Sequence, residues 1–262
     1  MEQTGQVPSN APQLCGFTSR LSHLDIDFSE SLQPALVSKV LAACSTDDEQ
    51  HPLTESAVDE WMLTRRLQQL LADAIQTRGR HLLLQSRCGN EACLEMIEIP
   101  LDLHMFRQDT DDLSVETVID GNTVRLRLPT GHDQRRWCTR GEAVDAATMA
   151  AELVLTLNGS KPADDWRIPP AWINIIGDQL ENLDALTVLQ LKTNCPGCGQ
   201  LLELELDLEQ RLLTELAICQ RNMLNEIHLL ASAYHWSEKD IFALSPSRRS
   251  HYIARLERDG LL

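Results

Sequence analysis

The sequence predicts an α+β fold in which two similar β-hairpins are separated by an inserted mixed α/β region and followed by a C-terminal helical segment. The first observation is a pair of closely spaced cysteines that occurs twice, each time between short apolar runs typical of strands. The second is a long run of apolar residues at helical spacing near the C-terminus. Each cysteine pair with its flanks is therefore interpreted as strand, turn and strand.

The second cysteine pair, Cys195 and Cys198, has Pro and Gly between its members and a further Gly after them, which favours a tight turn. Such a turn points both sulfurs toward one position and supplies half of a tetrahedral metal site. Cys88 and Cys93 repeat the pattern, although four residues rather than two separate them. The segments that match in register, counted from the second cysteine of each pair, are residues 96–103 and 201–208.

Two such hairpins that share one metal ion form a zinc ribbon, here split by about a hundred inserted residues. Zinc is favoured over redox chemistry and over inert thiols. A redox Cys-x-x-Cys pair stands at a helix N-terminus, whereas glycine and an acidic strand follow the second pair here. Four thiolates leave no coordination position for an activated water, so the ion would be structural. The predicted ligands of this structural Zn²⁺ are Cys88, Cys93, Cys195 and Cys198, while Cys15, Cys44, Cys138 and Cys219 are interpreted as buried or incidental thiols.

The N-terminal arm, residues 1–54, has little periodicity and several prolines, and it is predicted to be partly irregular. A short helix is expected over residues 32–44, and the acidic stretch 45–50 resembles a linker. Such an arm is either loosely attached or wraps a partner, and loose attachment is the simpler interpretation. Residues 55–103 are predicted to contain a helix that ends at Arg78 and then the first cysteine hairpin.

The inserted region, residues 104–185, carries its own hairpin and helix signals. An Asp-Gly pair predicts a tight turn between two strands, and a Thr-x-x-Asp pattern resembles the capping box of a helix that carries Trp137. A Pro-Pro pair can open a later helix. The corresponding segments are the acidic loop 109–112, strands 115–119 and 124–128 around Asp120 and Gly121, a helix that begins near Thr130 and Asp133, and helical stretches 141–157 and 171–183.

Residues 186–208 are predicted to form the second cysteine hairpin, and residues 209–262 to be helical. A long amphipathic helix should run to about Tyr234, and two serine-initiated patterns predict shorter helices after it. The last helix is basic within an acidic chain, which suits either a solvated helix end or docking to an acidic partner surface. Arg and Trp are enriched at interface anchors, so docking is favoured. The predicted partner-binding residues are Trp236, Arg248, Arg249, Tyr252 and Arg255.

Composition argues against several classes of function. A formal net charge of −16 disfavours contact with nucleic acid and with acidic membranes. No apolar run is long enough to span a membrane and no signal-peptide pattern is present, so we expect a protein kept in a reducing cytoplasm. Asp133 beside His132 is better explained as a helix cap than as an acid–base pair. No nucleophile, phosphate loop or carboxylate pair has a recognisable context, and we expect no enzymatic activity.

Longer motifs add a family resemblance. Residues 228–241 read His-Leu-Leu-Ala-Ser-Ala-Tyr-His-Trp-Ser-Glu-Lys-Asp-Ile and are followed by Leu-Ser-Pro-Ser-Arg-Arg and Tyr252. Upstream, residues 125–133 read Arg-Leu-Arg-Leu-Pro-Thr-Gly-His-Asp. Together with the Cys-x-x-Cys-Gly turn, the acidic strand and the long helix after it, these motifs resemble baseplate-type proteins of tailed phages and of related contractile injection systems. The resemblance spans residues 55–258.

This resemblance implies a structural component of a baseplate or tail hub that works through protein contacts in an oligomeric assembly. Its expected partners are other baseplate, hub, spike or tube proteins, with no nucleic acid and no membrane. It implies a protein present in the bacterial cytoplasm during assembly and then in the phage tail or injection-system baseplate. Two alternatives stay open: an assembly chaperone that is absent from the finished particle, and a zinc-ribbon adaptor for nucleic acid. The acidic side chains on the cysteine-hairpin strands argue against the adaptor.

Overall fold

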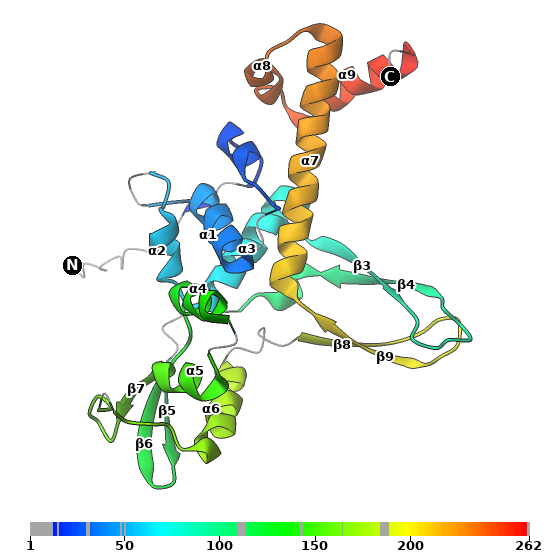
Figure 1. The fold of residues 1–262 in the computed structure, drawn as a ribbon. Coiled ribbons are helices and arrows are strands. Elements are labelled where there is room, and N and C mark those ends of the chain that lie inside the picture. The colour runs from blue at the N-terminus through cyan, green and yellow to red at the C-terminus, as the bar shows by residue number, and fades with distance from the viewer. Residues whose placement is uncertain are drawn as a thin grey trace, which may run out of the picture.

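A helical body, two projecting cysteine hairpins, an inserted region and a C-terminal arm make up the fold in the computed structural model (Figure 1). All strand pairs are antiparallel, and the sheets are small: β1–β2, β3–β4, β5–β6–β7 and β8–β9. The predicted α+β class is therefore confirmed. The structure describes residues 13–14, 16–29, 32–47, 49, 51–108, 114–141, 144–163, 165–183 and 189–260.

The helical body buries the N-terminal helix α1 (Gln33–Cys44) at its centre. Val37, Val40 and Leu41 are fully buried against α3 (Leu63–Arg78) and the first turns of α7 (Leu208–Tyr234). The predicted helix is thus confirmed, but the loosely attached arm is wrong for this part of the chain. A helix that is buried on most of its faces lacks the one-sided apolar stripe by which core helices are recognised in a sequence.

Two boundaries near this body differ from the sequence predictions. Ser45–Thr46, expected in a linker, form the buried strand β2 and pair with β1 (Gln13–Leu14). The helix expected up to Arg78 is interrupted after α2 (Glu55–Asp59), because the Leu63 amide donates to the Pro129 carbonyl at 2.9 Å. This contact anchors the inserted region on the body.

Arg66 on α3 connects α3 to α1 and α2 inside the helical body. Its guanidinium is fully buried and donates to the Asp59 carboxylate at 2.8 Å and to the Pro34 carbonyl at 2.9 Å. A Cβ atom on Gly131 would overlap this guanidinium, which explains the glycine at the start of α4 (Gly131–Arg140). An unpaired charge at this position would be strongly destabilising, so Asp59 is essential for the burial of Arg66.

The inserted region contains a three-stranded sheet covered by helices. Asp120 and Gly121 both have positive φ, 50° and 79°, as the predicted Asp-Gly turn requires. Residues 154–157, predicted to be helical, instead form strand β7 and pair with β6, since Val and Thr suit a strand and the neighbouring β6 offers pairing partners. The expected acidic loop 109–112 lies outside the described residues. The elements are β5 (Ser114–Ile119), β6 (Asn122–Arg127), α4, α5 (Ala146–Leu153), β7 (Val154–Leu157) and α6 (Pro170–Leu183).

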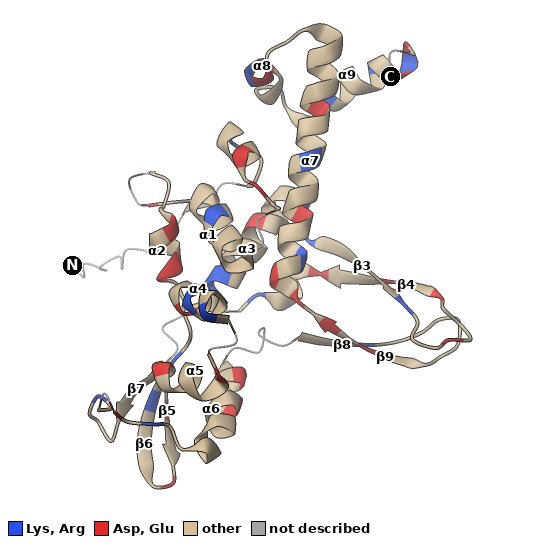
Figure 2. Cartoon of the chain, in the orientation of Figure 1, with Lys and Arg blue, Asp and Glu red and all other residues tan. Residues whose placement is uncertain are grey.

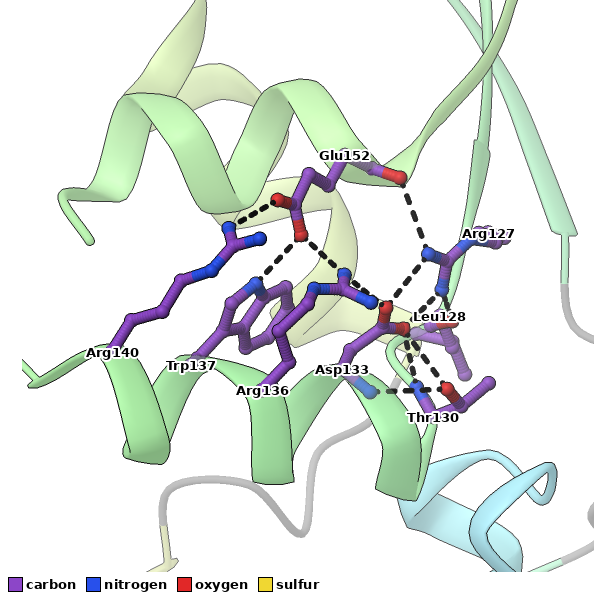
Figure 3. A network of polar contacts seen from close by, with 8 residues as sticks. All are labelled: Arg127, Leu128, Thr130, Asp133, Arg136, Trp137, Arg140 and Glu152. Carbon is purple, nitrogen blue, oxygen red and sulfur yellow. Dashed lines mark hydrogen bonds and ion pairs between the residues drawn. The ribbon is translucent and has the colours of Figure 1, made fainter. Parts of the chain in front are cut away.

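Asp133 is the centre of a polar network that joins β6, α4 and α5 (Figure 3). The predicted capping box is present, with Thr130 and Asp133 bonding reciprocally. Arg127 forms an ion pair with the same carboxylate, and Arg136 lies 2.8 Å from it. Burial alone would raise the pKa of Asp133, but Arg127 together with the Thr130 amide and hydroxyl outweighs it and lowers the pKa to about 2. Asp133 is therefore a structural cap, as predicted.

The C-terminal arm extends from the body along the far half of α7 and carries two short helices (Figure 1). Its own apolar cluster is centred on Ile227, Leu230 and Leu256. A 3-10 helix, η1 (Leu21–Asp25), packs Leu24 against this cluster, so the N-terminal arm braces the C-terminal arm. The two short helices, both capped by the predicted serines, are α8 (Glu238–Phe242) and α9 (Pro246–Arg258). In the described part of the chain, no helix is long and apolar enough to cross a membrane.

Candidate metal centre

The two cysteine hairpins bring their four predicted ligands to one point. The sulfur atoms of Cys88, Cys93, Cys195 and Cys198 all lie within 4.8 Å of one another. The Sγ–Sγ distances are 3.7 Å between Cys88 and Cys198 and 3.8 Å between Cys93 and Cys195. All four are free cysteines, so no disulfide explains their proximity. These four residues can hold a metal ion, and they form the only such group of three or more potential ligands within the described residues.

The spacing of the sulfurs suits a tetrahedral ion. With zinc–sulfur bonds of about 2.3 Å, two sulfurs at tetrahedral corners lie about 3.8 Å apart. The Cys88–Cys198 and Cys93–Cys195 distances match this value, and each of these pairs joins one hairpin to the other. A shared ion would therefore cross-link residues that are 110 and 102 positions apart in the chain.

Regular strand pairing places the first cysteine of each hairpin. The hairpins are β3 with β4 and β8 with β9, and a backbone bond continues each ladder into its turn. The Cys88 amide donates to the Glu95 carbonyl at 2.8 Å, and the Cys195 amide donates to the Gln200 carbonyl at 2.9 Å. The strands are β3 (His81–Arg87), β4 (Met96–Asp102), β8 (Leu189–Asn194) and β9 (Leu201–Leu206).

Both turns close with the same backbone bond before the strand resumes. In the second hairpin the Gly199 amide donates to the Cys195 carbonyl at 2.8 Å, and in the first the Leu94 amide donates to the Asn90 carbonyl at 3.0 Å. In the second hairpin the acceptor of this bond is the first cysteine itself, whereas in the first hairpin it is Asn90, two residues after Cys88, so the extra length of the first hairpin lies at the start of its turn. The wider spacing of the first pair does not keep it from the cluster. The sequence prediction did not single out Asn90 or Leu94, and only an alignment of the two turns from their C-terminal ends could have found them.

The cluster is closed on its inner side and open at its tip. Cys88 and Cys195 are buried with Ile97 and Leu202 in a small apolar cluster, while Cys93 is half-buried and Cys198 is exposed. The two turns are in contact, as a Cβ atom on Gly197 would lie 3.3 Å from the Cys93 sulfur. A side chain there would push the turns apart, which is a physical reason for glycine at this position.

Without a cation, the pKa values of the closely spaced thiols shift in opposite directions. The Asn90 amide favours the Cys88 thiolate, but desolvation and the neighbouring Cys195 and Cys198 sulfurs outweigh it and raise the pKa of Cys88 to about 12. The Gln200 amide, followed by the other sulfurs, lowers the pKa of Cys198 to about 7. A divalent cation would relieve the repulsion between thiolates, because it offers all four the same positive charge.

The predicted partner-binding residues divide into an inner and an outer group. Arg249 is only 5 % exposed, and it donates to the Glu226 carboxylate at 2.7 Å and to the Leu244 carbonyl at 2.6 Å. It therefore holds α9 to α7, and its role in partner contact stays a prediction. Trp236 and Tyr252 are half-buried and pack edge to face, with ring centroids 4.9 Å apart. Arg248 and Arg255 are exposed on α9.

The remaining cysteines are separate from the cluster. Cys44 is buried in the body, Cys219 is half-buried and Cys138 is exposed, and Cys15 lies outside the described residues. No family model, curated protein or solved structure matches this chain.

Proposed function

We propose that the four cysteines hold one structural zinc ion and that the chain is a split zinc ribbon. The observation that carries this proposal is the approach of four sulfurs to tetrahedral spacing, two from each hairpin. Zinc suits an all-thiolate tetrahedral site better than calcium or magnesium, which prefer oxygen ligands. Four protein ligands fill the shell, so the ion would stabilise the fold and would not activate a water molecule.

Elemental analysis of the purified full chain tests this directly. We expect one zinc per chain after purification in buffer without added metal. Quantitative iron in place of zinc, with the visible absorption of an iron–thiolate centre, would assign the site to iron. Complete absence of metal from a folded chain would contradict the proposal.

We further propose that the protein is a non-enzymatic structural component of a phage-tail-like baseplate or hub. The ordered motifs that resemble baseplate-type proteins support this role, and so does an architecture with several projecting parts. The cysteine hairpins, the inserted region and the C-terminal arm each extend from the helical body (Figure 1). A metal-clamped ribbon is a stiff element that suits contacts within a large assembly.

The proposed role is tested by locating the chain in intact particles. Quantitative mass spectrometry of purified tails or injection systems should find it at a fixed ratio to tube and sheath proteins. Its presence only in precursors would favour the assembly chaperone. Tight retention of DNA or RNA in filter binding, lost as salt is raised, would favour the nucleic-acid adaptor.

A further inference from the structure

A pocket apart from the cysteine cluster contains two arginines that form no ion pair with a carboxylate among the described residues. It lies where the start of α3 meets β5 and β6, and its volume is about 380 Å³. Basic residues mark β6 and α4 in Figure 2 against a predominantly acidic chain. Its lining includes Glu60, Trp61, Arg65, Ser114, Arg125 and Arg127.

Arg65 has a geometry that prepares it for an anion. Its guanidinium carbon lies 4.4 Å above the centre of the Trp61 ring, and its side chain is half-buried. Stacking on a ring occupies the flat face of a guanidinium and leaves its in-plane N–H groups free to donate. Among the described residues, no carboxylate forms an ion pair with Arg65. Burial lowers the pKa of Arg65 from its ordinary value, as expected for a cation that lacks a compensating charge.

Arg125 adds a second cation at the same pocket. It is exposed on β6, and its guanidinium donates to the Ser114 hydroxyl at 3.3 Å. The described part of the chain offers it no carboxylate within ion-pair distance. Arg127 also lines the pocket, but its charge is already balanced by Asp133. Within the described residues, the pocket thus contains one arginine with a carboxylate partner and two without one.

A half-buried arginine such as Arg65, with no carboxylate partner among the described residues, is unexpected in this chain. The net charge is −16, and carboxylates outnumber Lys and Arg by 39 to 23. Glu60 does line the pocket, yet its carboxylate lies 3.2 Å from the His132 imidazole. Partial burial of an unpaired charge is unfavourable unless an external group compensates it.

We infer that this pocket binds a carboxylate of an acidic peptide segment from a partner protein, with Arg65 and Arg125 as the recognising groups. A planar carboxylate can accept two parallel N–H bonds from the free edge of the Arg65 guanidinium. The Ser114 hydroxyl beside Arg125 offers a further donor. A phosphate group is the less suitable oxyanion, because Glu60 and the acidic chain oppose a second negative charge. The inference concerns a surface apart from the cysteine cluster and does not depend on the zinc ion.

The test uses the full chain and a dye-labelled peptide of glutamates, followed by fluorescence anisotropy at low salt. We expect saturable binding, weakened about fivefold to tenfold by Arg65→Gln and by Arg125→Gln. Glu60→Gln should tighten binding, because it removes a competing charge. Arg221→Gln, which neutralises an exposed arginine on α7, is the matched control and should bind like the wild type. A glutamine peptide of the same length should not bind.

Charge reversal distinguishes a loss of binding caused by the missing charge from one caused by a perturbed fold. Arg65→Glu with Arg125→Glu should lose the glutamate peptide and gain a lysine peptide, while circular dichroism stays unchanged. Equal binding by wild type, Arg65→Gln and Arg125→Gln would overturn the inference, as would absence of saturable binding at millimolar peptide. Stronger competition by inorganic phosphate than by acetate would assign the pocket to phosphate instead. Binding that appears only when Asp111 and Asp112 are changed to Asn would assign the arginines to the chain's own acidic residues and also overturn it.

Discussion

The two cysteine hairpins place their cysteines in similar positions although their turns differ in sequence and length. Both place one cysteine directly after the first strand and the other three residues before the second strand. The first turn nevertheless has two more residues, and its closing backbone bond begins at Asn90, two residues after Cys88, instead of at the first cysteine. All four sulfurs still meet within 4.8 Å. The comparison teaches that strand register and the C-terminal end of each turn position the ligands, whereas the length of the turn is adjustable.

The hairpins also differ in the residue that follows the second cysteine. Gly199 has φ of 73°, and its counterpart Leu94 has φ of 51°. Both turns thus need the left-handed conformation at this position, which glycine adopts freely and leucine adopts at a cost of about 1 kcal/mol. The Leu94 side chain is 54 % exposed, so little burial compensates for this strain. The first hairpin is therefore the more strained half of the proposed ribbon.

The largest expected effect comes from removing one buried sulfur from either hairpin. Cys88→Ser and Cys195→Ser should each reduce bound zinc from one per chain to nearly none, because a structural site needs all four thiolates. Metal binding in zinc-finger peptides contributes roughly 10–16 kcal/mol, so both hairpins should lose protection in hydrogen exchange. Cys138→Ser is the control and should retain the metal. Full zinc content in either hairpin variant would show that the cluster is not the metal site.

A smaller effect is expected when the second hairpin is given the first hairpin's residue. Gly199→Leu imposes the left-handed conformation on a leucine and should destabilise the zinc-bound hairpin by about 1–2 kcal/mol. Zinc affinity, measured by competition with a chromophoric chelator, should fall by roughly tenfold. An unchanged affinity would mean that this turn relaxes to another conformation.

Contact between the two turns is tested by adding one methyl group. Gly197→Ala places a Cβ atom 3.3 Å from the Cys93 sulfur, so we expect a loss of about 1 kcal/mol in stability. Gly89→Ala is the matched variant in the other turn, where a Cβ atom meets nothing within 4 Å, and it should be nearly neutral. Chemical denaturation of the zinc-bound protein gives both values. Equal effects would argue that the turns do not touch in solution.

The smallest expected effect has the opposite sign. Leu94→Gly relieves the left-handed leucine and should stabilise the first hairpin by up to about 1 kcal/mol, less the extra entropy of glycine in the unfolded chain. Thermal unfolding with zinc present measures the gain. A clear loss of stability would indicate that the Leu94 side chain makes a contact that outweighs the strain.

Local signals in the sequence predicted much of the fold. The capping box at Thr130, the Asp-Gly turn and the serine caps of α8 and α9 all depend on neighbours within four residues, and the structure contains each of them. The four cysteines were likewise predicted from their spacing and their repeat. Strand β7 was missed because it directly follows an Ala- and Leu-rich stretch with helical spacing. Only its pairing with β6 distinguishes it from a continuation of that helix.

Other features depended on neighbours that no local pattern reveals. The N-terminal helix α1 became part of the core because α3 and α7 cover it, and Arg249 became a buried anchor because Glu226 faces it from α7. Neither the burial of α1 nor the burial of Arg249 can be inferred from adjacent positions in the chain.

By itself the sequence determined the Asp-Gly turn, the capping box at Thr130, the serine caps of α8 and α9, and which cysteines carry metal-ligand spacing, because these properties arise from steric and hydrogen-bond preferences over a few residues. Tertiary structure alone decided that Cys88 lies beside Cys198 and Cys93 beside Cys195, and which arginines keep a carboxylate partner. Such contacts join residues up to 110 positions apart, and only the packing of the intervening elements brings their side chains together.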